Sequence, residues 1–193
     1  MKIDNINQEE AIKLIYVNKI PNKTKINGKK TFIELSIEQN DIDNLKLEIS
    51  NSITKDLPPK PKFNIKLLLS GLNLTRMDIN GYHTNPEFEK EIYSEILDDI
   101  YEEKTRDKMQ KIMKLMEKYS EYIFKKDDYH IHFYINLSYI KEDIWAFPIH
   151  IFNINKSENI IDNIREFCQE FNIKLSNNNL SNLNHLKGIS NEH

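Results

Sequence analysis

The chain has 193 residues, 39% of them hydrophobic and 30% charged, so it can bury a core and is not disordered in composition. The formal net charge of −3 gives no global attraction to nucleic acid or to an acidic membrane. Cys168 is the only cysteine, which excludes an intramolecular disulfide and a zinc site built from cysteines.

Targeting signals and the charge distribution indicate where the protein is located and what kind of partner it binds. No stretch approaches the ~20 apolar residues of a membrane span, and the first ten residues lack the apolar run of a signal peptide. We therefore expect a cytoplasmic protein without membrane contact. Residues 1–86 hold 13 basic and 10 acidic side chains, whereas residues 87–128 hold 9 and 13. The mildly basic first section is the only electrostatic hint of a phosphate-bearing partner.

The first part of the chain predicts a short helix followed by antiparallel strands. Residues 6–17 have helical spacing, with Asn7 as the N-cap and Glu10 completing a capping box. The dipeptide Asn27-Gly28 is a strong hairpin signal, and alternation follows it. Further strands are expected at residues 44–50, 62–71 and 72–80, with a proline-rich break at 58–61 and turns at Ser70-Gly71 and Asn80-Gly81.

A helical segment interrupts this pattern. Residues 87–124 contain neither proline nor glycine, and their apolar residues recur at helical spacing as far as Ile123. The pattern breaks at residues 102–108, which predicts either the corner of a helical hairpin there or a single helix of ~55 Å. The apolar stripe packs either on its own domain or on a partner chain, including a second copy of this chain.

The last third predicts two strands, a helix and a tail. Residues 129–137 and 145–152 are strand-like, and the second places Trp145 and Ile151 on a core face with His150 opposite. A helix is expected from Ser157, its candidate cap, to Ile173, with Cys168 as a small buried apolar residue.

These elements predict an α+β fold. We expect a single domain over residues 1–174, with an antiparallel sheet of five to seven strands and flanking helices. The segment 87–124 is expected to be a helical insertion, and residues 175–193 a flexible tail.

Two polar strand faces suggest one site. Side chains alternate along a strand, so His130, His132 and Tyr134 share a face opposite isoleucine and phenylalanine. By the same argument Arg76 and Asp78 lie together, and a turn follows them. The candidate site therefore comprises Arg76, Asp78, His83, His130 and His132 as catalytic residues, with Asn85 and Tyr134 as binding residues.

The same residues also have ordinary interpretations. Arg76 and Asp78 could form a surface ion pair worth less than ~1 kcal/mol, and the histidines could be solvated on an exposed strand. If they form a site, three chemistries fit. Two imidazoles with a carboxylate could bind a divalent metal. One histidine as base and another as acid, with Arg76 on the phosphate, would suit metal-independent RNA cleavage. The same donors could also hold a nucleotide without catalysis.

The motif string resembles that of a known family. Arg76-x-Asp78, then His83-x-Asn85-Pro86, His130-x-His132-x-Tyr134 and Trp145-Ala146 are similar to an uncharacterised family of small bacterial and phage proteins, over roughly residues 5–172. The chain departs from that family where residues 87–124 replace a short turn. A fainter similarity, in the Arg-x-Asp and His-x-His spacing, is to TumE-type toxins, which implies a toxin–antitoxin or phage-conflict setting and RNase activity.

Three functions follow as expectations. The first is a histidine-dependent RNase-like phosphodiesterase or nucleotide-acting toxin of a mobile element, with RNA or a nucleotide as its partner. The second is a non-catalytic protein-binding inhibitor, such as an anti-CRISPR protein or an antitoxin, that acts through the acidic insertion at 87–124. The third is a homo-oligomeric structural or accessory protein.

Overall fold

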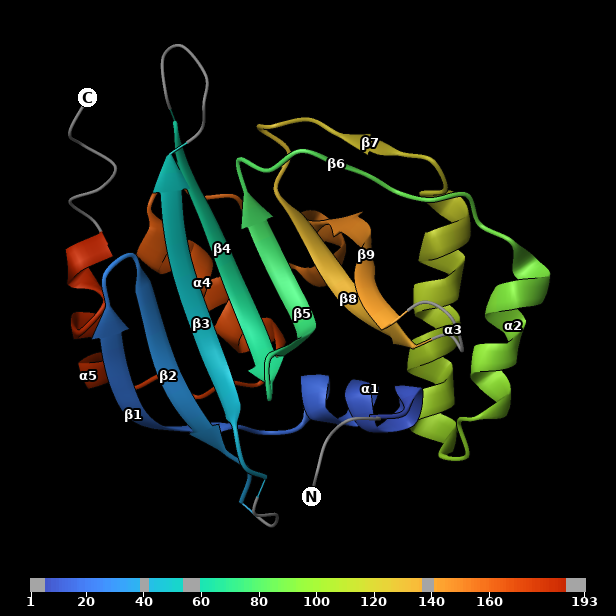
Figure 1. Ribbon diagram of the computed structural model, residues 1–193, viewed down its shortest axis with the longest axis horizontal. Helices are drawn as coiled ribbons and strands as arrows, with labels where there is room; N and C mark the ends of the chain where they lie inside the picture. Colours follow the sequence, from blue (N-terminus) through green and yellow to red (C-terminus); the bar gives the residue numbers. More distant parts are fainter. Residues whose placement is uncertain (1–5, 39–41, 54–59, 137–140, 187–193) are drawn as a thin grey trace.

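The computed structural model describes residues 6–38, 42–53, 60–136 and 141–186, which form an antiparallel sheet flanked by helices (Figure 1). The sheet has seven strands in the order β1-β2-β3-β4-β5-β8-β9, which confirms the predicted α+β fold. Consecutive strands are neighbours except between β5 and β8, where the insertion leaves and re-enters the sheet. The strands are β1 (Ile20–Asn27), β2 (Lys30–Ser36), β3 (Leu45–Ile53), β4 (Pro61–Leu69), β5 (Leu72–Ile79), β8 (His130–Asn136) and β9 (Lys141–Pro148).

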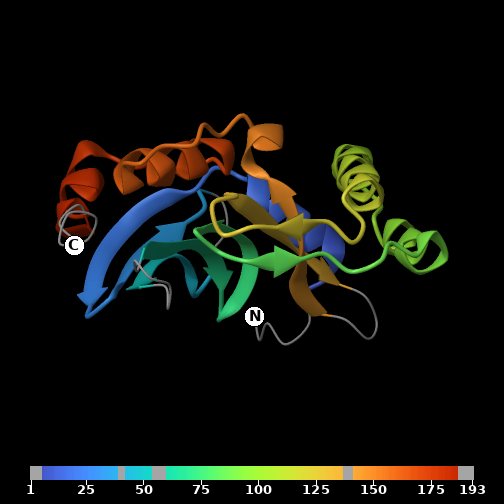
Figure 2. The same ribbon diagram turned by 90° about the horizontal axis from the view of Figure 1, so that it is seen from above.

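Helices cover one face of this sheet, and we call the opposite face the open face. Figure 2 shows α4 (Ile160–Glu170) and α5 (Asn177–Ser181) along the covered face. Alternation along the strands sends the apolar side chains to that side, where they meet the apolar stripe of α4 and of α1 (Gln8–Tyr16). Fully buried members of this core include Ile12, Ile33, Leu47, Ile65, Met77, Phe133 and Phe167.

The turn and cap signals of the first half are confirmed. The Asn7 side chain accepts from the Glu10 backbone N–H, and the Glu10 carboxylate accepts from the Asn7 N–H, which forms the predicted capping box. The predicted hairpin forms, with Gly28 and Lys29 as its turn residues between the paired Asn27 and Lys30, and Gly28 has a φ of +56°. Glycine adopts that left-handed region with the least strain, and the short turn fixes the register of the hairpin.

The insertion is a helical hairpin framed by a small two-stranded sheet. Helices α2 (Lys90–Asp98) and α3 (Glu103–Lys118) exclude the single long helix, and the corner lies at 99–102, ahead of the predicted 102–108. The corner forms there because Ile100 is fully buried and Arg106 donates twice to its carbonyl. The segments that precede and follow the hairpin, β6 (His83–Thr84) and β7 (Ile123–Phe124), pair with each other. Ile123 therefore lies in a strand, whereas the sequence predicted a helix there. Buried Met109 and Met116 join α3 to the core of the chain.

Three expectations for the last third are wrong in detail. Strand β9 ends at Pro148, and a 3-10 helix, η1 (Ile149–Phe152), follows, so His150 is not on the strand. The N-cap of α4 is Asn159 in place of Ser157, whose hydroxyl instead accepts from the Asn159 N–H. Part of the expected tail packs on the fold, because α5 lies within it and Leu183 and Leu186 are buried; residues 187–193 lie outside the described residues. Within the described part of the chain, no helix combines the length and apolar composition that crossing a bilayer demands.

Candidate active site

Strands β5 and β8 bring the two predicted motifs together. They pair antiparallel with Asp78 opposite His130 and Arg76 opposite His132, although about fifty residues separate them in sequence. All four side chains lie on the open face because their neighbours Met77, Ile131 and Phe133 point into the core. With His83, which packs on them from β6, they form what we call the histidine cluster: Arg76, Asp78, His83, His130 and His132.

The Asp78 carboxylate is the centre of the cluster. Its Oδ1 lies 2.9 Å from Arg76 Nε and accepts from the Asn64 side chain, and its Oδ2 lies 3.4 Å from His132 Nε2. Burial alone would raise the pKa of Asp78, but the adjacent His132 and the charge of Arg76 outweigh it and lower the pKa. The carboxylate is therefore ionised at neutral pH. Its side chain is only 9% exposed, so the expected surface ion pair with Arg76 is in fact largely buried.

The tautomer of His130 follows from its backbone contact. Its Nδ1 lies 2.8 Å from the Asp128 carbonyl oxygen, which can only accept, so Nδ1 carries the proton. Burial, followed by the neighbouring His132, lowers the pKa of His130 to about 4, and the ring is neutral at pH 7. Its Nε2 therefore carries a lone pair, and that atom lies 3.8 Å from Asp78 Oδ2.

A roof formed by β6 and β7 covers the two histidines of β8. The Phe124 ring lies 4.8 Å from that of His130, and the His83 ring lies 4.5 Å from that of His132, centroid to centroid. Both β8 histidines are 0% exposed, so the interpretation as solvated strand residues is wrong. Figures 1 and 2 show the β6–β7 pair crossing the ends of β5 and β8.

Asn85 positions His83. The Asn85 Nδ2 donates to the carbonyls of Tyr119 and Ala146, and its Oδ1 accepts from the Ala146 N–H, each at 2.9 Å. These bonds fix the orientation of the amide, so Oδ1 can only accept from His83 Nε2 at 3.1 Å. Neutral His83 consequently has Nδ1 as its basic nitrogen. Asn85 is itself buried and braces the insertion against the edge strand β9, so its geometry is that of a positioning residue.

The remaining predicted member lies elsewhere. Tyr134 is buried farther along β8, at an irregularity in the β8–β9 register, and its backbone carbonyl accepts from Gln8. Sequence reasoning also missed two neighbours of the cluster. Asn64 was hidden in an ordinary strand, and Gly81 was interpreted only as part of a turn. A Cβ at Gly81 would lie 3.1 Å from Asp78 Cβ, a tight contact that would require one of the two groups to shift by a few tenths of an ångström.

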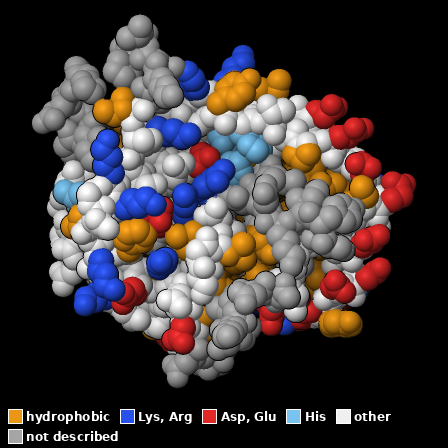
Figure 3. All heavy atoms as spheres, viewed as in Figure 1, with side chains coloured by type: hydrophobic (Ala, Val, Ile, Leu, Met, Phe, Trp, Pro, Cys, Tyr) orange, Lys and Arg blue, Asp and Glu red, His pale blue; other side chains and the backbone are white. Residues whose placement is uncertain are grey.

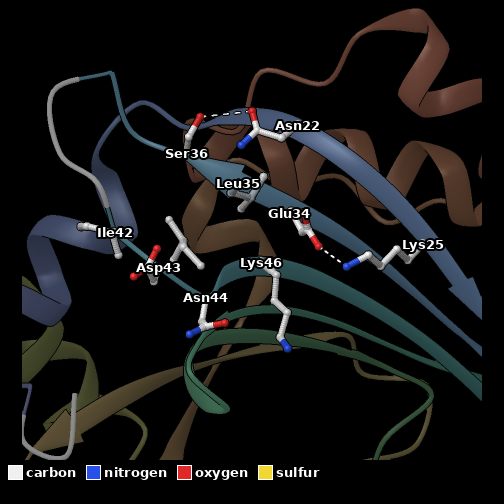
Figure 4. Close-up of a pocket in the computed structure, with 10 residues that line it drawn as sticks. Asn22, Lys25, Glu34, Leu35, Ser36, Ile42, Asp43, Asn44 and Lys46 are labelled. Atoms are coloured by element: carbon white, nitrogen blue, oxygen red, sulfur yellow. Dashed lines mark hydrogen bonds and ion pairs between the residues drawn. The ribbon is translucent and has the colours of Figure 1, made fainter. Parts of the chain in front are cut away.

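Among the described residues, no member of the histidine cluster lines either of two sizeable cavities. One, of about 610 Å³, lies beside β1, β2 and the start of β3, where Lys25 pairs with Glu34 and the Ser36 hydroxyl donates to Asn22 (Figure 4). As far as the structure describes its lining, that cavity has no histidine or cysteine. The other, of about 430 Å³, borders the cluster through Phe124 and Asp128, and Tyr122, Tyr129, His150 and Lys156 also line it. The second cavity is therefore the one that could serve the same ligand as the cluster.

Comparison with known proteins places the chain in a family. No curated protein and no solved structure matches it. A family model described as a family of unknown function, DUF6978, matches residues 6–173, which span the sheet, the insertion and every member of the histidine cluster. The chain belongs to this DUF6978 family.

Proposed function

We propose that this protein cleaves RNA, with Arg76 binding a backbone phosphate and His83 acting as general base. The observation that carries the proposal is that both residues contact one ring. Arg76 Nη2 lies 3.1 Å from His132 Nε2, and the His83 ring packs edge-on against the same imidazole. A cationic phosphate ligand and a base thus lie side by side, as acid–base cleavage of a phosphodiester requires.

Exposure separates the groups that can reach a substrate from those that hold them. The Arg76 side chain is 22% exposed and His83 is half-buried, whereas His130 and His132 are fully buried. Arg76 and His83 are therefore the members that can contact RNA. The other histidines and Asp78 orient them, which revises the expectation that all five residues act directly.

The open face offers a basic approach to this site. By strand register, its charged side chains on β2 to β5 comprise five basic and three acidic residues. One row crosses the sheet from Glu48 through Lys66 and Arg76 to His132. Figure 3 shows Lys and Arg side chains gathered on the strand side of this face and His side chains at its centre. Such a surface suits a phosphate backbone. Its charged residues are Lys30, Lys46, Lys62, Lys66 and Arg76, with Glu34, Glu48 and Asp78.

The cavity beyond Phe124 adds a place for a base. Tyr122 is 44% exposed there, and Lys156 Nζ lies 4.7 Å from the centre of the Tyr129 ring. Unpaired bases of single-stranded RNA stack on aromatic rings of this kind, whereas bases in a duplex are already stacked. Single-stranded RNA is therefore the expected substrate.

The test is cleavage of a fluorescent single-stranded RNA by the purified protein. His83→Ala should lower the rate about 100-fold, the usual contribution of a general base. His185→Ala is the matched control, since His185 is exposed and hydrogen-bonds Thr31 far from the cluster. Lys66→Ala should weaken RNA binding, more so at low salt, whereas Lys114→Ala on the exposed side of α3 should not. Equal rates for His83→Ala and wild type would rule out this function.

A second candidate rests on the corner of the helical hairpin. Tyr101 is 86% exposed there, and acidic residues flank it on both sides. The corner is held in place by α1, because Glu9 accepts the Tyr101 N–H and Lys13 pairs with Glu102. A fixed tyrosine among carboxylates suits a basic protein surface, as the inhibitor hypothesis expects. Tyr101→Ala should then remove inhibition of a partner and leave RNA cleavage unchanged.

A further inference from the structure

Three acceptor atoms converge inside the histidine cluster. Asp78, His130 and His132 each offer one ligand atom, and these three atoms all lie within 4.8 Å of one another. The carboxylate oxygen is 3.4 Å from His132 Nε2 and 3.8 Å from His130 Nε2. A tetrahedral metal with bonds of ~2.1 Å holds its ligand atoms ~3.4 Å apart, and the two distances from the carboxylate oxygen, 3.4 and 3.8 Å, lie close to that separation.

The contact between Asp78 and His130 needs a cation. Because Nδ1 of His130 donates to the Asp128 carbonyl, its Nε2 lone pair faces the carboxylate oxygen, and neither atom can donate. Among the described residues, His130 Nε2 has no hydrogen-bond partner, although it is fully buried. A buried acceptor without a donor beside a buried carboxylate is unfavourable unless a positive ion lies between them.

The surrounding groups already hold the ligands as metal sites require. The Asp128 carbonyl fixes the His130 ring, and Asn64 and Arg76 occupy Asp78 Oδ1, which leaves Oδ2 directed at the histidines. Metal-bound histidines almost always donate their second N–H to a carbonyl or carboxylate in this way.

We infer that Asp78, His130 and His132 bind one first-row divalent transition-metal ion. Two imidazoles and one carboxylate suit Zn²⁺, Fe²⁺ or Mn²⁺ better than Mg²⁺ or Ca²⁺, which prefer oxygen ligands. Three protein ligands leave coordination positions open, as in catalytic sites and unlike closed structural ones. The role of the ion in RNA cleavage rests on the proposed function, but its binding does not.

Arg76 lies beside the candidate metal ligands, so its substitution should raise zinc affinity, whereas substitution of a ligand should lower it. Its Nη2 lies 3.1 Å from His132 Nε2 and so donates to the lone pair that the metal needs. The side chain is partly exposed and can withdraw toward solvent while its Nε stays on Asp78. Removing this charge should therefore strengthen metal binding, whereas it should weaken the binding of phosphate.

The experiment is zinc titration of the chelator-stripped full chain by calorimetry, with Co²⁺ absorption as a spectroscopic readout of ligand geometry. We expect one ion per chain, a loss of affinity of roughly ten-fold or more in His130→Gln and His132→Gln, and a gain of roughly ten-fold in Arg76→Gln. His185→Ala should bind as wild type, and circular dichroism shows which variants fold. If folded wild type binds no zinc, or if neither glutamine variant weakens binding, the inference is overturned. The inference is also overturned if Arg76→Gln binds zinc more weakly than wild type.

The two proposals fail in different ways. Zinc bound at these residues without any RNA cleavage would contradict the proposed function alone. Cleavage that depends on His83, persists in excess chelator and occurs in a protein that binds no zinc would contradict the metal site alone.

Discussion

Replacing Asn85 tests how the insertion is fastened to the sheet. In Asn85→Ala the Tyr119 carbonyl, the Ala146 carbonyl and the Ala146 N–H each lose a partner in a buried site. At ~1 kcal/mol for each unsatisfied group, the free energy of unfolding should fall by about 3 kcal/mol. Asn85→Asp should be worse, because a carboxylate cannot donate to the two carbonyls and would face them as a buried charge.

Urea denaturation followed by circular dichroism measures this loss. Asn18→Ala, at an exposed site, is the matched control and should change stability by no more than ~0.5 kcal/mol. Hydrogen exchange gives a local readout, since the Ala146 amide should exchange faster only in the Asn85 variants. A loss below ~1 kcal/mol with unchanged exchange at Ala146 would refute the reasoning, because it would mean that these bonds contribute little.

Three further predictions concern other buried groups. Lys19 is fully buried and donates to the carbonyls of Ile15, Val17 and Phe171. Lys19→Met should therefore lower the free energy of unfolding, measured by urea denaturation, by about 3 kcal/mol, and an unchanged value would contradict that role. Gly81→Ala should crowd Asp78 and lower both RNA cleavage and zinc affinity while the protein stays folded by circular dichroism; unchanged activity would show that the space is not needed. Burial raises the pKa of the Cys168 thiol, so it should react with a thiol reagent only after unfolding. Above pH ~8.5 the thiol ionises in the unfolded chain but not in the folded one. The free energy of unfolding, relative to that of Cys168→Ala, should therefore fall as pH rises; a difference that does not change with pH would contradict the raised pKa.

Features set by near neighbours in sequence could be predicted. The capping box at Asn7, the hairpin signalled by Asn27-Gly28 and the turn at Ser70-Gly71 depend on contacts within a few residues. All three occur, although the first hairpin turns at Gly28-Lys29, one residue later than its signal. Alternation likewise placed Arg76 and Asp78 on one strand face, because the period of a strand is independent of what packs on it.

Features set by contacts between residues distant in sequence could not be predicted. The corner of the hairpin depends on the burial of Ile100 and on Arg106, and the spacing of apolar residues does not show which turn is covered. Burial of His130 and His132 depends on Phe124 and His83, which reach them only because β6 pairs with β7. A strand pattern shows which side chains share a face but not what lies above that face.

The separation of charge across the molecule bears on how fast a ligand arrives. Basic side chains outnumber acidic ones on the open face of β2 to β5, whereas acidic residues outnumber basic ones in the segment 87–128. Figure 3 shows many of the acidic side chains along the right-hand edge of the molecule, away from those strands. The protein thus has an electric dipole, and a polyanion that approaches it is turned toward the strands despite the net charge of −3. Association should therefore be steered, with an on-rate that falls as salt screens the field over ~10 Å.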